Sequence, residues 1–497
     1  MGTLLIRADA SVSMGTGHVM RCLALAQAWQ DAGGKAVLAS VDLLPSVRER
    51  LLSEGVEVVS LESAPGSADD ARCATELANR YAAAWVVVDG YHFLADYQQK
   101  LKTAGLRVLF LDDNGHADHY AADLVLNQNV HADESYYRSR EPYTRLLLGT
   151  RYVLLRREFR SWSNWKREIA PVGRRVLVSM GGSDPRNVTA SVMQALRSIA
   201  VDGLEVAVVA GGSNPHLGSL ERTVESYDGG FRLLKNVLNM PELMAWADVA
   251  VAAAGTTFWE ICALGLPSIL VVLAKNQRSI AERATQLGAA ENLGDSSSVT
   301  ATMIANALQK LLGSPEEREI RSQCARRLVD GRGSQRVLTF LSDLKLRRAN
   351  DGDGQLFWDW ANDPGTRASS FTSKTISWEE HVAWFRSKLA DPQAILYTAT
   401  NGEGTPLGEV RFQLRQDAAT LSISLGKEFR GHGWGRRILE GAIHQLFHDY
   451  HVQFIDAYVK PENEASLRLF AGSGFKRMGS ETIEGQQAVH FVLRRGA

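Results

Sequence analysis

A histidine at the start of a predicted helix is the first residue of the chain suited to proton transfer. The apolar strand at residues 4–7 leads through a turn with Gly15 and Gly17 into a helix that we expect to start at His18 and run to about Ala32. A histidine has a reference pKa of about 6.5, and a helix N-terminus favours its neutral, basic form. The glycines and the free N–H groups of the helix start favour an anion, with a diphosphate as the obvious candidate. The pattern also fits a tight turn without a ligand, in which His18 only hydrogen-bonds the loop.

Three further turns at strand ends contain small residues that can surround a phosphate. They lie at residues 181–184, 211–214 and 253–257, and each precedes a predicted helix. Asp184 is the expected N-cap of the first helix, with Pro185 at its first position. Glu260, about one turn inside the third helix, is suited to accept hydrogen bonds from ribose hydroxyls. The turns also fit ordinary strand-to-helix connections, but none is a Walker A motif, and the turn before His18 lacks GxGxxG spacing.

The C-terminal third contains the strongest single motif, RGHGWG at residues 430–435, between a predicted strand and a predicted helix. Successive N–H groups at such a helix entry can wrap a pyrophosphate, and Arg430 and Arg436 add positive charge. Glu409, on an earlier strand, is the best candidate for a general base, directly or through water. An exposed strand glutamate without a catalytic role is the alternative.

The elements that position these residues alternate short apolar strands with amphipathic helices, which is typical of parallel α/β architecture. Two series of strands predict two doubly wound Rossmann-like halves with a ligand cleft between them, since ligands bind beyond the carboxyl ends of parallel strands. The predicted strands are residues 4–7, 35–40, 56–61, 85–88, 108–111 and 124–126, then 175–179, 204–210, 248–252 and 268–273.

After these halves the pattern changes to an antiparallel α+β unit. Residues 331–346 are expected to form a closing helix, and the glycine-rich, polar residues 347–354 a linker. Strands are expected at residues 394–400, 407–414, 420–425 and 454–459, with one helix before the last of these strands, another after it, and a terminal hairpin. The predicted domains are therefore residues 1–160, 161–346 and 355–497.

Composition limits the functional class. A chain of 497 residues predicts about three domains. Lys+Arg 55 against Asp+Glu 56 gives a net charge of -1, so neither nucleic acid nor a membrane surface is the expected partner. The four cysteines form no CxxC pair, and no apolar run approaches the roughly 20 residues of a membrane span. The first apolar run is interrupted by Arg7 and Asp9, unlike a signal peptide, so we interpret the protein as cytoplasmic.

The first two thirds resemble a known family. The segments RADASVSMGTGHVMR (7–21), LDDNGH (111–116), LVLNQN (124–129), SMGGSD (179–184), AAGTTFWE (253–260) and LAKNQ (273–277) are similar to the UDP-2,4-diacetamido-2,4,6-trideoxy-β-L-altropyranose hydrolases of pseudaminic acid biosynthesis. The resemblance covers roughly residues 3–345. It implies a fold like that of GT-B glycosyltransferases.

The resemblance also assigns roles. His18 would activate water to attack the anomeric carbon and expel UDP with inversion. The positions expected to bind the UDP-sugar are Asp9, Gly15, Gly17, Arg21, Gly182, Ser183, Asn214, Gly255, Thr256, Thr257, Glu260, Asn276 and Gln277. Asp89 and Asp113 are expected to line the same cleft, although both also fit N-caps or turn residues. No metal is required, because UDP is a good leaving group whose charge helix N-termini can stabilise.

The C-terminal third resembles the GNAT acyltransferase superfamily, through RGHGWG (430–435) and through NEASLRLF (463–470) followed by Gly474-Phe475. The resemblance implies acetyl-CoA as cosubstrate, bound by Ile423, Leu425, Arg430, Gly431, Gly433, Gly435, Arg436, Asn463 and Ser466. Phe470 stands where many members have a tyrosine that protonates the leaving thiolate, so water or another group, such as Tyr458, would supply that proton. The segment around Asp363 and Arg367 resembles the acceptor side of sugar amine acetyltransferases.

Together the resemblances predict a bifunctional enzyme. The C-terminal domain would acetylate the 4-amino group of a UDP-linked 4-amino-4,6-dideoxy sugar, and the N-terminal part would hydrolyse the diacetamido product to free sugar and UDP. The alternative is a GT-B glycosyltransferase with a CoA-binding module that has no catalytic role.

Overall fold

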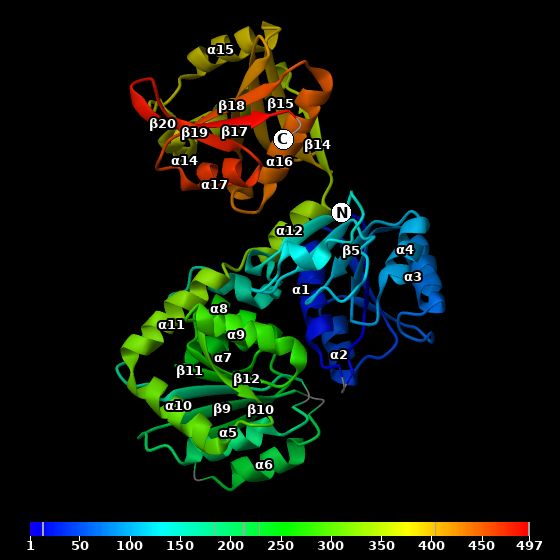
Figure 1. Ribbon diagram of the computed structural model, residues 1–497, viewed down its shortest axis with the longest axis vertical. Coiled ribbons are helices and arrows are strands. Elements are labelled where there is room, and N and C mark those ends of the chain that lie inside the picture. The colour runs from blue at the N-terminus through cyan, green and yellow to red at the C-terminus, as the bar shows by residue number, and fades with distance from the viewer. Residues whose placement is uncertain (12–13, 183, 212–213, 228, 403, 496–497) are drawn as a thin grey trace. The chain divides into compact units, whose positions relative to one another are not determined.

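The structure is a computed structural model that describes residues 1–497 apart from 12–13, 183, 212–213, 228, 403 and 496–497. It divides into two compact units, Met1–Leu338 and Thr339–Ala497 (Figure 1). Two parallel sheets build the first unit, and one mixed sheet builds the second. This is the predicted α/β class, a pair of Rossmann-like halves followed by an α+β unit.

The N-terminal half is a seven-stranded parallel sheet in the order β3-β2-β1-β4-β5-β6-β7. Its strands are β1 (Thr3–Ala8), β2 (Lys35–Ser40), β3 (Glu57–Ser60), β4 (Ala83–Asp89), β5 (Val108–Leu111), β6 (Leu124–Asn127) and β7 (Arg145–Leu148). Its helices are α1 (Gly17–Asp31), α2 (Pro45–Ser53), α3 (Ala68–Arg80) and α4 (Ala95–Thr103). Figure 1 shows α1 on the opposite side of this sheet from α3 and α4. The strand order reverses between β1 and β4, so the loops after these two strands lie at a switch point, where such sheets bind ligands.

The C-terminal half of the first unit is a six-stranded parallel sheet in the order β10-β9-β8-β11-β12-β13. Its strands are β8 (Arg175–Ser179), β9 (Glu205–Ala210), β10 (Phe231–Lys235), β11 (Val249–Ala253), β12 (Ser268–Val272) and β13 (Ala290–Asp295). Its helices are α5 (Val188–Arg197), α6 (Leu217–Glu225), α7 (Met240–Trp246), α8 (Thr256–Ala263), α9 (Arg278–Gln286), α10 (Ala301–Gly313) and α11 (Pro315–Leu328). Helix α12 (Gly333–Leu341) follows, and Ser334 and Arg336 near its start donate to the carbonyls of Leu155 and Arg151.

Alternate residues of these strands are buried in two separate hydrophobic cores. Val176 and Val178 of β8 pack in the core that contains α5, α6 and α10, whereas Leu177 packs in the core that contains α7, α8 and α9. Helices therefore cover both faces of the sheet, which explains why its strands are continuously apolar.

The second unit is a seven-stranded mixed sheet in the order β14-β15-β16-β17-β18-β20-β19. Its strands are β14 (Leu344–Arg348), β15 (Ala394–Asn401), β16 (Pro406–Arg415), β17 (Ala418–Leu425), β18 (Phe454–Val459), β19 (Lys476–Ile483) and β20 (Gln486–Arg494). Its helices are α13 (Gly354–Asn362), α14 (Pro364–Ser369), α15 (Trp378–Ala390), α16 (Trp434–Asp449) and α17 (Glu464–Gly472). Helix α16 packs on one face of the sheet, and α13 and α15 pack on the other.

The structure differs from the predicted elements at the end of the first unit. The expected closing helix at residues 331–346 ends at Leu341, and the chain then forms β14, which pairs with β15. The expected linker at residues 347–354 is instead the end of β14, a short 3-10 turn and the start of α13. Arg347 bonds Asp353 at 2.7 Å, and this pair draws the polar segment into ordered structure.

Four strands were not predicted, namely β7, β10, β13 and β14. Each lies at an edge of its sheet and is less buried than the central strands. No helix of the described part of the chain is long and apolar enough to cross a bilayer.

Candidate active sites

His18 lies in the first turn of α1, at the switch point of the N-terminal sheet. The helix begins at Gly17, one residue before the predicted start, and Gly15 adopts a φ of 77° that favours glycine. The Nδ1 atom of His18 lies 2.6 Å from the Oδ1 atom of Asp89, at the end of β4. Because Nδ1 faces the carboxylate, Nε2 is directed away from Asp89 and remains the ring nitrogen for a substrate.

Asp89 and Asp113 share one buried guanidinium, that of Arg21 one turn further along α1. Arg21 donates two hydrogen bonds to Asp89, at 2.7 and 2.6 Å, and one to Asp113, at 2.6 Å. Burial alone would raise the pKa of both carboxyl groups, but the positive charge of Arg21 outweighs burial and holds each pKa below its usual value. Arg21, which the sequence predicted to bind the UDP-sugar, holds the two carboxylates beside His18.

A tyrosine that the sequence analysis did not single out joins this network to the other half. The hydroxyl of Tyr91 donates to Asp113 at 2.8 Å and accepts from the Nδ2 atom of Asn276 at 2.9 Å. Its ring lies edge-on to the His18 ring, with 5.0 Å between centroids. Asn276 was a predicted site residue, and this bond brings it to His18. Tyr91 follows β4 by two residues, so its place after the end of a central strand was the available signal.

The N-termini of α1 and α8 come together beside His18. A Cβ atom on Gly17 would lie 3.5 Å from the Oγ1 atom of Thr256, and one on Gly255 would lie 3.5 Å from the Nε2 atom of Gln277. Gln277 is held by the bond from the backbone N–H of Leu273 to its Oε1 atom, at 2.9 Å. Four predicted residues therefore meet here, with Thr257 at the next position of α8. Two helix N-termini facing one point form a site for an anion such as a diphosphate.

Glu260, the residue expected at a ribose, is paired with an arginine from the segment between the halves. The Oε1 atom of Glu260 accepts from Nη2 and Nε of Arg156, at 2.7 and 3.1 Å. Burial raises the pKa of Glu260, and the charge of Arg156 opposes that rise. Both bonds end on Oε1, so Oε2 remains as an acceptor for a hydroxyl. The sequence analysis did not assign Arg156.

The glycine turns after β8 and β9 approach each other closely. A Cβ atom on Gly211 would lie 2.6 Å from the carbonyl oxygen of Gly182, so only glycine fits there. The side chain of Asn214 is buried and accepts from the N–H of His216 at 2.8 Å, which shapes its own turn. Ser183 lies outside the described residues. These turns follow neighbouring strands, as predicted.

Two further expectations for the first unit are modified. Asp184 is not the N-cap residue of α5, because the helix starts at Val188 rather than at Pro185 and its N-cap is Asn187; the Asp184 carboxylate still accepts from the N–H groups of Val188 and Thr189 at 2.9 Å. Asp9 is fully buried, and its Oδ1 atom accepts from Arg7 at 2.7 Å and from Ser40 at 2.8 Å. Its contacts lie within the N-terminal half and hold the loop after β2.

In the second unit, the RGHGWG loop enters α16 through two left-handed glycines, Gly431 with a φ of 78° and Gly433 with a φ of 92°. Next to it, β17 and β18 form parallel pairs only from Ala418 to Thr420. The strands therefore separate beside Ile423 and Leu425, and the backbone of this part of β17 faces the opening. A cofactor chain can bond that backbone while the loop binds its phosphates. Gly435 lies against Leu425, since a Cβ atom there would be 3.5 Å from Leu425 Cδ1.

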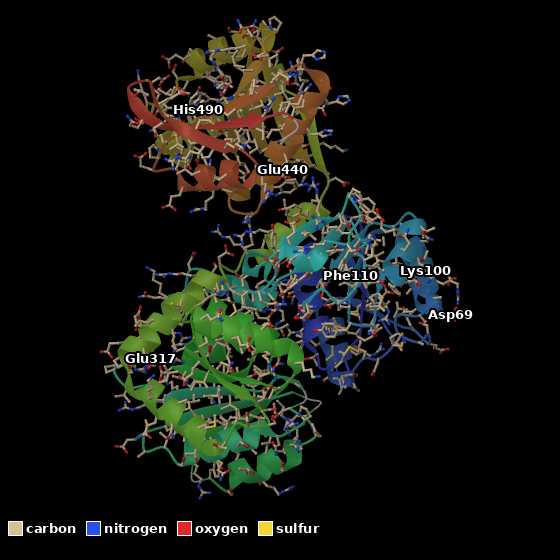
Figure 2. The ribbon with its side chains drawn as sticks, in the orientation of Figure 1. Asp69, Lys100, Phe110, Glu317, Glu440 and His490 are labelled. Carbon is tan, nitrogen blue, oxygen red and sulfur yellow. The ribbon has the colours of Figure 1, made fainter. Side chains whose placement is uncertain are left out.

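The charged and polar residues predicted to bind the cofactor differ in their hydrogen-bond partners. Arg436 is exposed on α16, where it pairs with Glu440 at 2.7 Å (Figure 2 labels Glu440). Arg430 bonds Asp363, Thr366 and the carbonyl of Leu425, all within the second unit. Asn463 caps α17 by accepting from the N–H of Ser466 at 3.1 Å.

Glu409 is buried rather than exposed, which removes the alternative of a solvated strand glutamate. Its exposed fraction is 2%, and its Oε2 atom has no hydrogen-bond partner. Arg411 lies 3.4 Å from the same oxygen. Burial raises the pKa of Glu409, and the charge of Arg411 only partly opposes the rise. A buried carboxylate with a free oxygen and increased basicity is suited to accept a proton from an amine.

The aromatic residues near the opening have different surroundings. Phe470 is buried against Phe475 and Phe491, with ring centroids 5.1 and 5.9 Å away. Tyr458 of β18 stacks on His490 with 4.7 Å between centroids (Figure 2 labels His490). Burial raises the pKa of Tyr458, as do the nearby Glu481 and Asp456, so its phenol holds its proton.

Comparison with known proteins agrees with this division of the chain. The glycosyltransferase family 28 C-terminal domain model matches residues 176–335, and the acetyltransferase (GNAT) domain model matches residues 343–476. An uncharacterized protein of Methanocaldococcus jannaschii is 22% identical over 94% of this chain and 96% of its own length, so the similarity extends through both units.

Two other relatives match the first unit. The UDP-2,4-diacetamido-2,4,6-trideoxy-beta-L-altropyranose hydrolase of Campylobacter jejuni is 25% identical over 56% of this chain and 94% of the hydrolase. The spore coat polysaccharide biosynthesis protein SpsG of Bacillus subtilis is 28% identical over 49% of this chain and 71% of that protein. The chain therefore joins a region similar to the Campylobacter hydrolase, with a glycosyltransferase family 28 C-terminal domain, to a C-terminal acetyltransferase (GNAT) domain, as the two resemblances of its sequence predicted.

Proposed function

We propose that the first unit hydrolyses a UDP-2,4-diacetamido-2,4,6-trideoxy sugar to free sugar and UDP. The observation that carries the proposal is the buried network of His18, Asp89, Arg21 and Asp113. Asp89 and Asp113 place two carboxylates against the single guanidinium of Arg21 beside His18. Asp89 on Nδ1 fixes the ring orientation, as an acidic partner does for a histidine base.

The proposed reaction begins when Nε2 of His18 takes a proton from water. The water oxygen bonds to the anomeric carbon as the bond from that carbon to the UDP oxygen breaks, with inversion. The negative charge that develops on UDP is stabilised by the N–H groups at the starts of α1 and α8. The proton then leaves the imidazolium to solvent.

We propose that the second unit transfers an acetyl group from acetyl-CoA to the 4-amino group of a UDP-linked 4-amino-4,6-dideoxy sugar. The amine nitrogen attacks the thioester carbonyl, Glu409 accepts the amine proton directly or through water, and the C–S bond breaks. The thiolate of CoA takes a proton from water or from Tyr458. The support is the GNAT domain match together with the burial and the free oxygen of Glu409.

One experiment tests both activities. The whole chain is incubated with the UDP-amino sugar and acetyl-CoA, and CoA thiol, UDP and the free sugar are measured. Release of CoA followed by UDP and a free diacetamido sugar supports the proposal. UDP release that requires an added acceptor would instead favour glycosyl transfer, an alternative kept by the 34% identity over 124 residues to an N-acetylglucosamine transferase of Xanthomonas euvesicatoria.

A further inference from the structure

We propose that Arg430 is a positioning residue that couples helix α14 to the acetyl-CoA loop, so that binding of the cofactor orders the acceptor side of the second unit. The proposal rests on the proposed acetyl transfer. It replaces the expectation that the Arg430 guanidinium contacts the pyrophosphate.

All three nitrogens of the Arg430 guanidinium are already bonded within the second unit. Nη1 donates to Oδ1 of Asp363 at 2.5 Å, Nη2 to Oγ1 of Thr366 at 3.0 Å, and Nε to the carbonyl of Leu425 at 3.0 Å. A planar guanidinium presents its donors in a fixed fork, so this set of partners fixes both its position and its orientation. These bonds use three of the five N–H donors of the guanidinium, so Asp363, Thr366 and Leu425 orient Arg430 before a cofactor binds.

The partners of Arg430 belong to elements with different roles. Leu425 ends β17, the strand whose backbone faces the opening beside β18. Asp363 is the N-cap of α14, where its Oδ1 atom also accepts from the N–H of Thr366 at 3.1 Å. The arginine therefore bonds the cap of α14, its first turn, and the end of the cofactor strand at once.

The chain leaves room for this arrangement. A Cβ atom on Gly365 would lie 2.8 Å from Nη1 of Arg430, so a larger residue in the first turn of α14 would press on the guanidinium. On the other side, Gly431 continues the chain with a left-handed φ of 78°, which turns the backbone into the phosphate-binding loop immediately after Arg430.

Helix α14 is connected to the sheet face on which Glu409 lies. Glu409 pairs with Thr398, so its side chain shares a face with Leu396, two residues away on β15. Leu396 packs with Phe357 and Trp360 of α13, the helix that directly precedes α14. An amine that reaches Glu409 must therefore approach beside these two helices, and the position of α14 affects its binding.

The segment that follows α14 reaches the β19–β20 hairpin. Thr372 donates to Glu484 at 2.5 Å, and Gln486 donates to the carbonyl of Phe371 at 2.5 Å. Arg430 thus holds the start of a segment whose other end is held by the hairpin. Loss of the arginine bonds would release that start without removing any group of the phosphate-binding loop backbone.

The test compares Arg430→Gln, Arg430→Lys and Asp363→Asn with Arg436→Gln in the whole chain. Coupling of this kind corresponds to roughly 5–150-fold in affinity. We expect Arg430→Gln and Asp363→Asn to raise the KM for the amino sugar by about tenfold, within that range, while the Kd for CoA changes little. Arg430→Lys keeps the charge but loses the fork, so it should also raise that KM. Arg436→Gln should raise the Kd for CoA and change the KM for the amino sugar little. Arg494 is an exposed arginine of β20, and Arg494→Gln should change neither constant.

A double variant and hydrogen exchange separate positioning from general damage. Arg430→Gln combined with Asp363→Asn should raise the KM no further than either change alone, because both break the same bond. Without any acceptor, CoA should slow amide exchange in a peptide that contains α14 in the unchanged protein but not in Arg430→Gln.

Either of two results would overturn the proposal. One is a CoA Kd that rises in Arg430→Gln as much as in Arg436→Gln, with CoA still protecting α14. The other is the absence of any effect of CoA on α14 in the unchanged protein. If the chain transfers no acetyl group to the amino sugar, the proposed function fails, but the exchange measurement with CoA alone still tests the coupling.

Discussion

In the first unit, three charged residues lie beside His18. Arg21 is the cation that keeps Asp89 and Asp113 ionised, and Asp89 in turn faces Nδ1 of His18. Nη2 of Arg21 also lies 3.3 Å from Nδ1 of His18, so this edge of the imidazole contacts both the carboxylate and the guanidinium. In the second unit the base that we propose is a carboxylate, Glu409, whose pKa is raised by burial.

His18→Ala should reduce the rate of UDP release from the diacetamido UDP-sugar by about 10²–10⁴-fold, the usual contribution of a positioned base. Asp89→Asn should cause a loss of similar order, because an amide favours the wrong tautomer and cannot stabilise the imidazolium. UDP release is measured by a coupled assay. Asp69→Asn, an exposed carboxylate on α3 that Figure 2 labels, is the control and should leave the rate unchanged. An Asp89→Asn enzyme with full activity would contradict the role given to this pair.

Acetyl transfer should depend on the ionised form of Glu409. Because the pKa of Glu409 is raised, the rate of acetyl transfer should fall as pH decreases through a value above the usual glutamate range. Glu409→Gln should be slower by about 10²–10⁴-fold, and its rate should lose this pH dependence. CoA thiol release over a pH series measures both. An unchanged profile in Glu409→Gln would show that another group accepts the proton.

The same residue should lower the stability of the second unit. A raised pKa in the folded state means that stability is greatest below the unfolded pKa and decreases as pH rises through the folded value. Glu409→Gln removes the ionised form, so it should raise the thermal midpoint at neutral pH and have less effect in acid. Scanning calorimetry at several pH values measures this, and a lower midpoint at neutral pH would contradict the account.

At the scale of elements, the strand order explains why residues distant in sequence meet. His18 and Asp89 follow β1 and β4, which are neighbours at the reversal of the first sheet. The turns with Gly182 and Gly255 follow β8 and β11, which are neighbours at the reversal of the second. Parallel strands bring their carboxyl ends to one edge, and the glycines there allow the turns to approach each other.

Gly211→Ala tests this close approach. The added methyl group would lie 2.6 Å from the backbone of Gly182, which cannot move aside as a flexible side chain does, so we expect a loss of about 1–3 kcal/mol in the free energy of unfolding. Gly313→Ala is the matched control: it ends α10 with no atom within 4 Å of the added group. It should be neutral or stabilising by at most about 1 kcal/mol. Denaturant unfolding compares them, and equal stability of the two variants would contradict the packing.

The central elements could be predicted because their residues are apolar on both faces and end in glycine turns. The strands at Lys35–Ser40, Val108–Leu111, Arg175–Ser179 and Phe454–Val459 have the predicted bounds. The edge strand β14 could not be predicted, because the segment LKLRR adopts its strand conformation by pairing with β15 rather than through its own apolar pattern. In the site, His18 and Asn276 could be predicted, but the bond from Asn276 to Tyr91 depends on how two halves meet. Arg430 lies in a motif that indicates a phosphate ligand, and its bonds to Asp363, Thr366 and Leu425 could not be predicted from that motif.

At the scale of the whole molecule, the chain binds two anionic ligands, by our proposal, with a net charge of -1. The positive potential comes from local features: helix starts in the first unit and a glycine loop with Arg436 in the second. The two proposed reactions are consecutive, since acetylation of the amine produces the diacetamido sugar that the hydrolase consumes. A single chain with both units would therefore convert one UDP-sugar through two steps.

The mass of the product formed from a defined UDP-amino sugar and acetyl-CoA tests this central claim most directly. The unchanged chain should yield UDP and a free diacetamido sugar, His18→Ala should stop at the acetylated UDP-sugar, and Glu409→Gln should leave most of the starting UDP-amino sugar. Release of UDP from the amino sugar without acetyl-CoA, or a product that stays linked to UDP in the unchanged chain, would contradict the account.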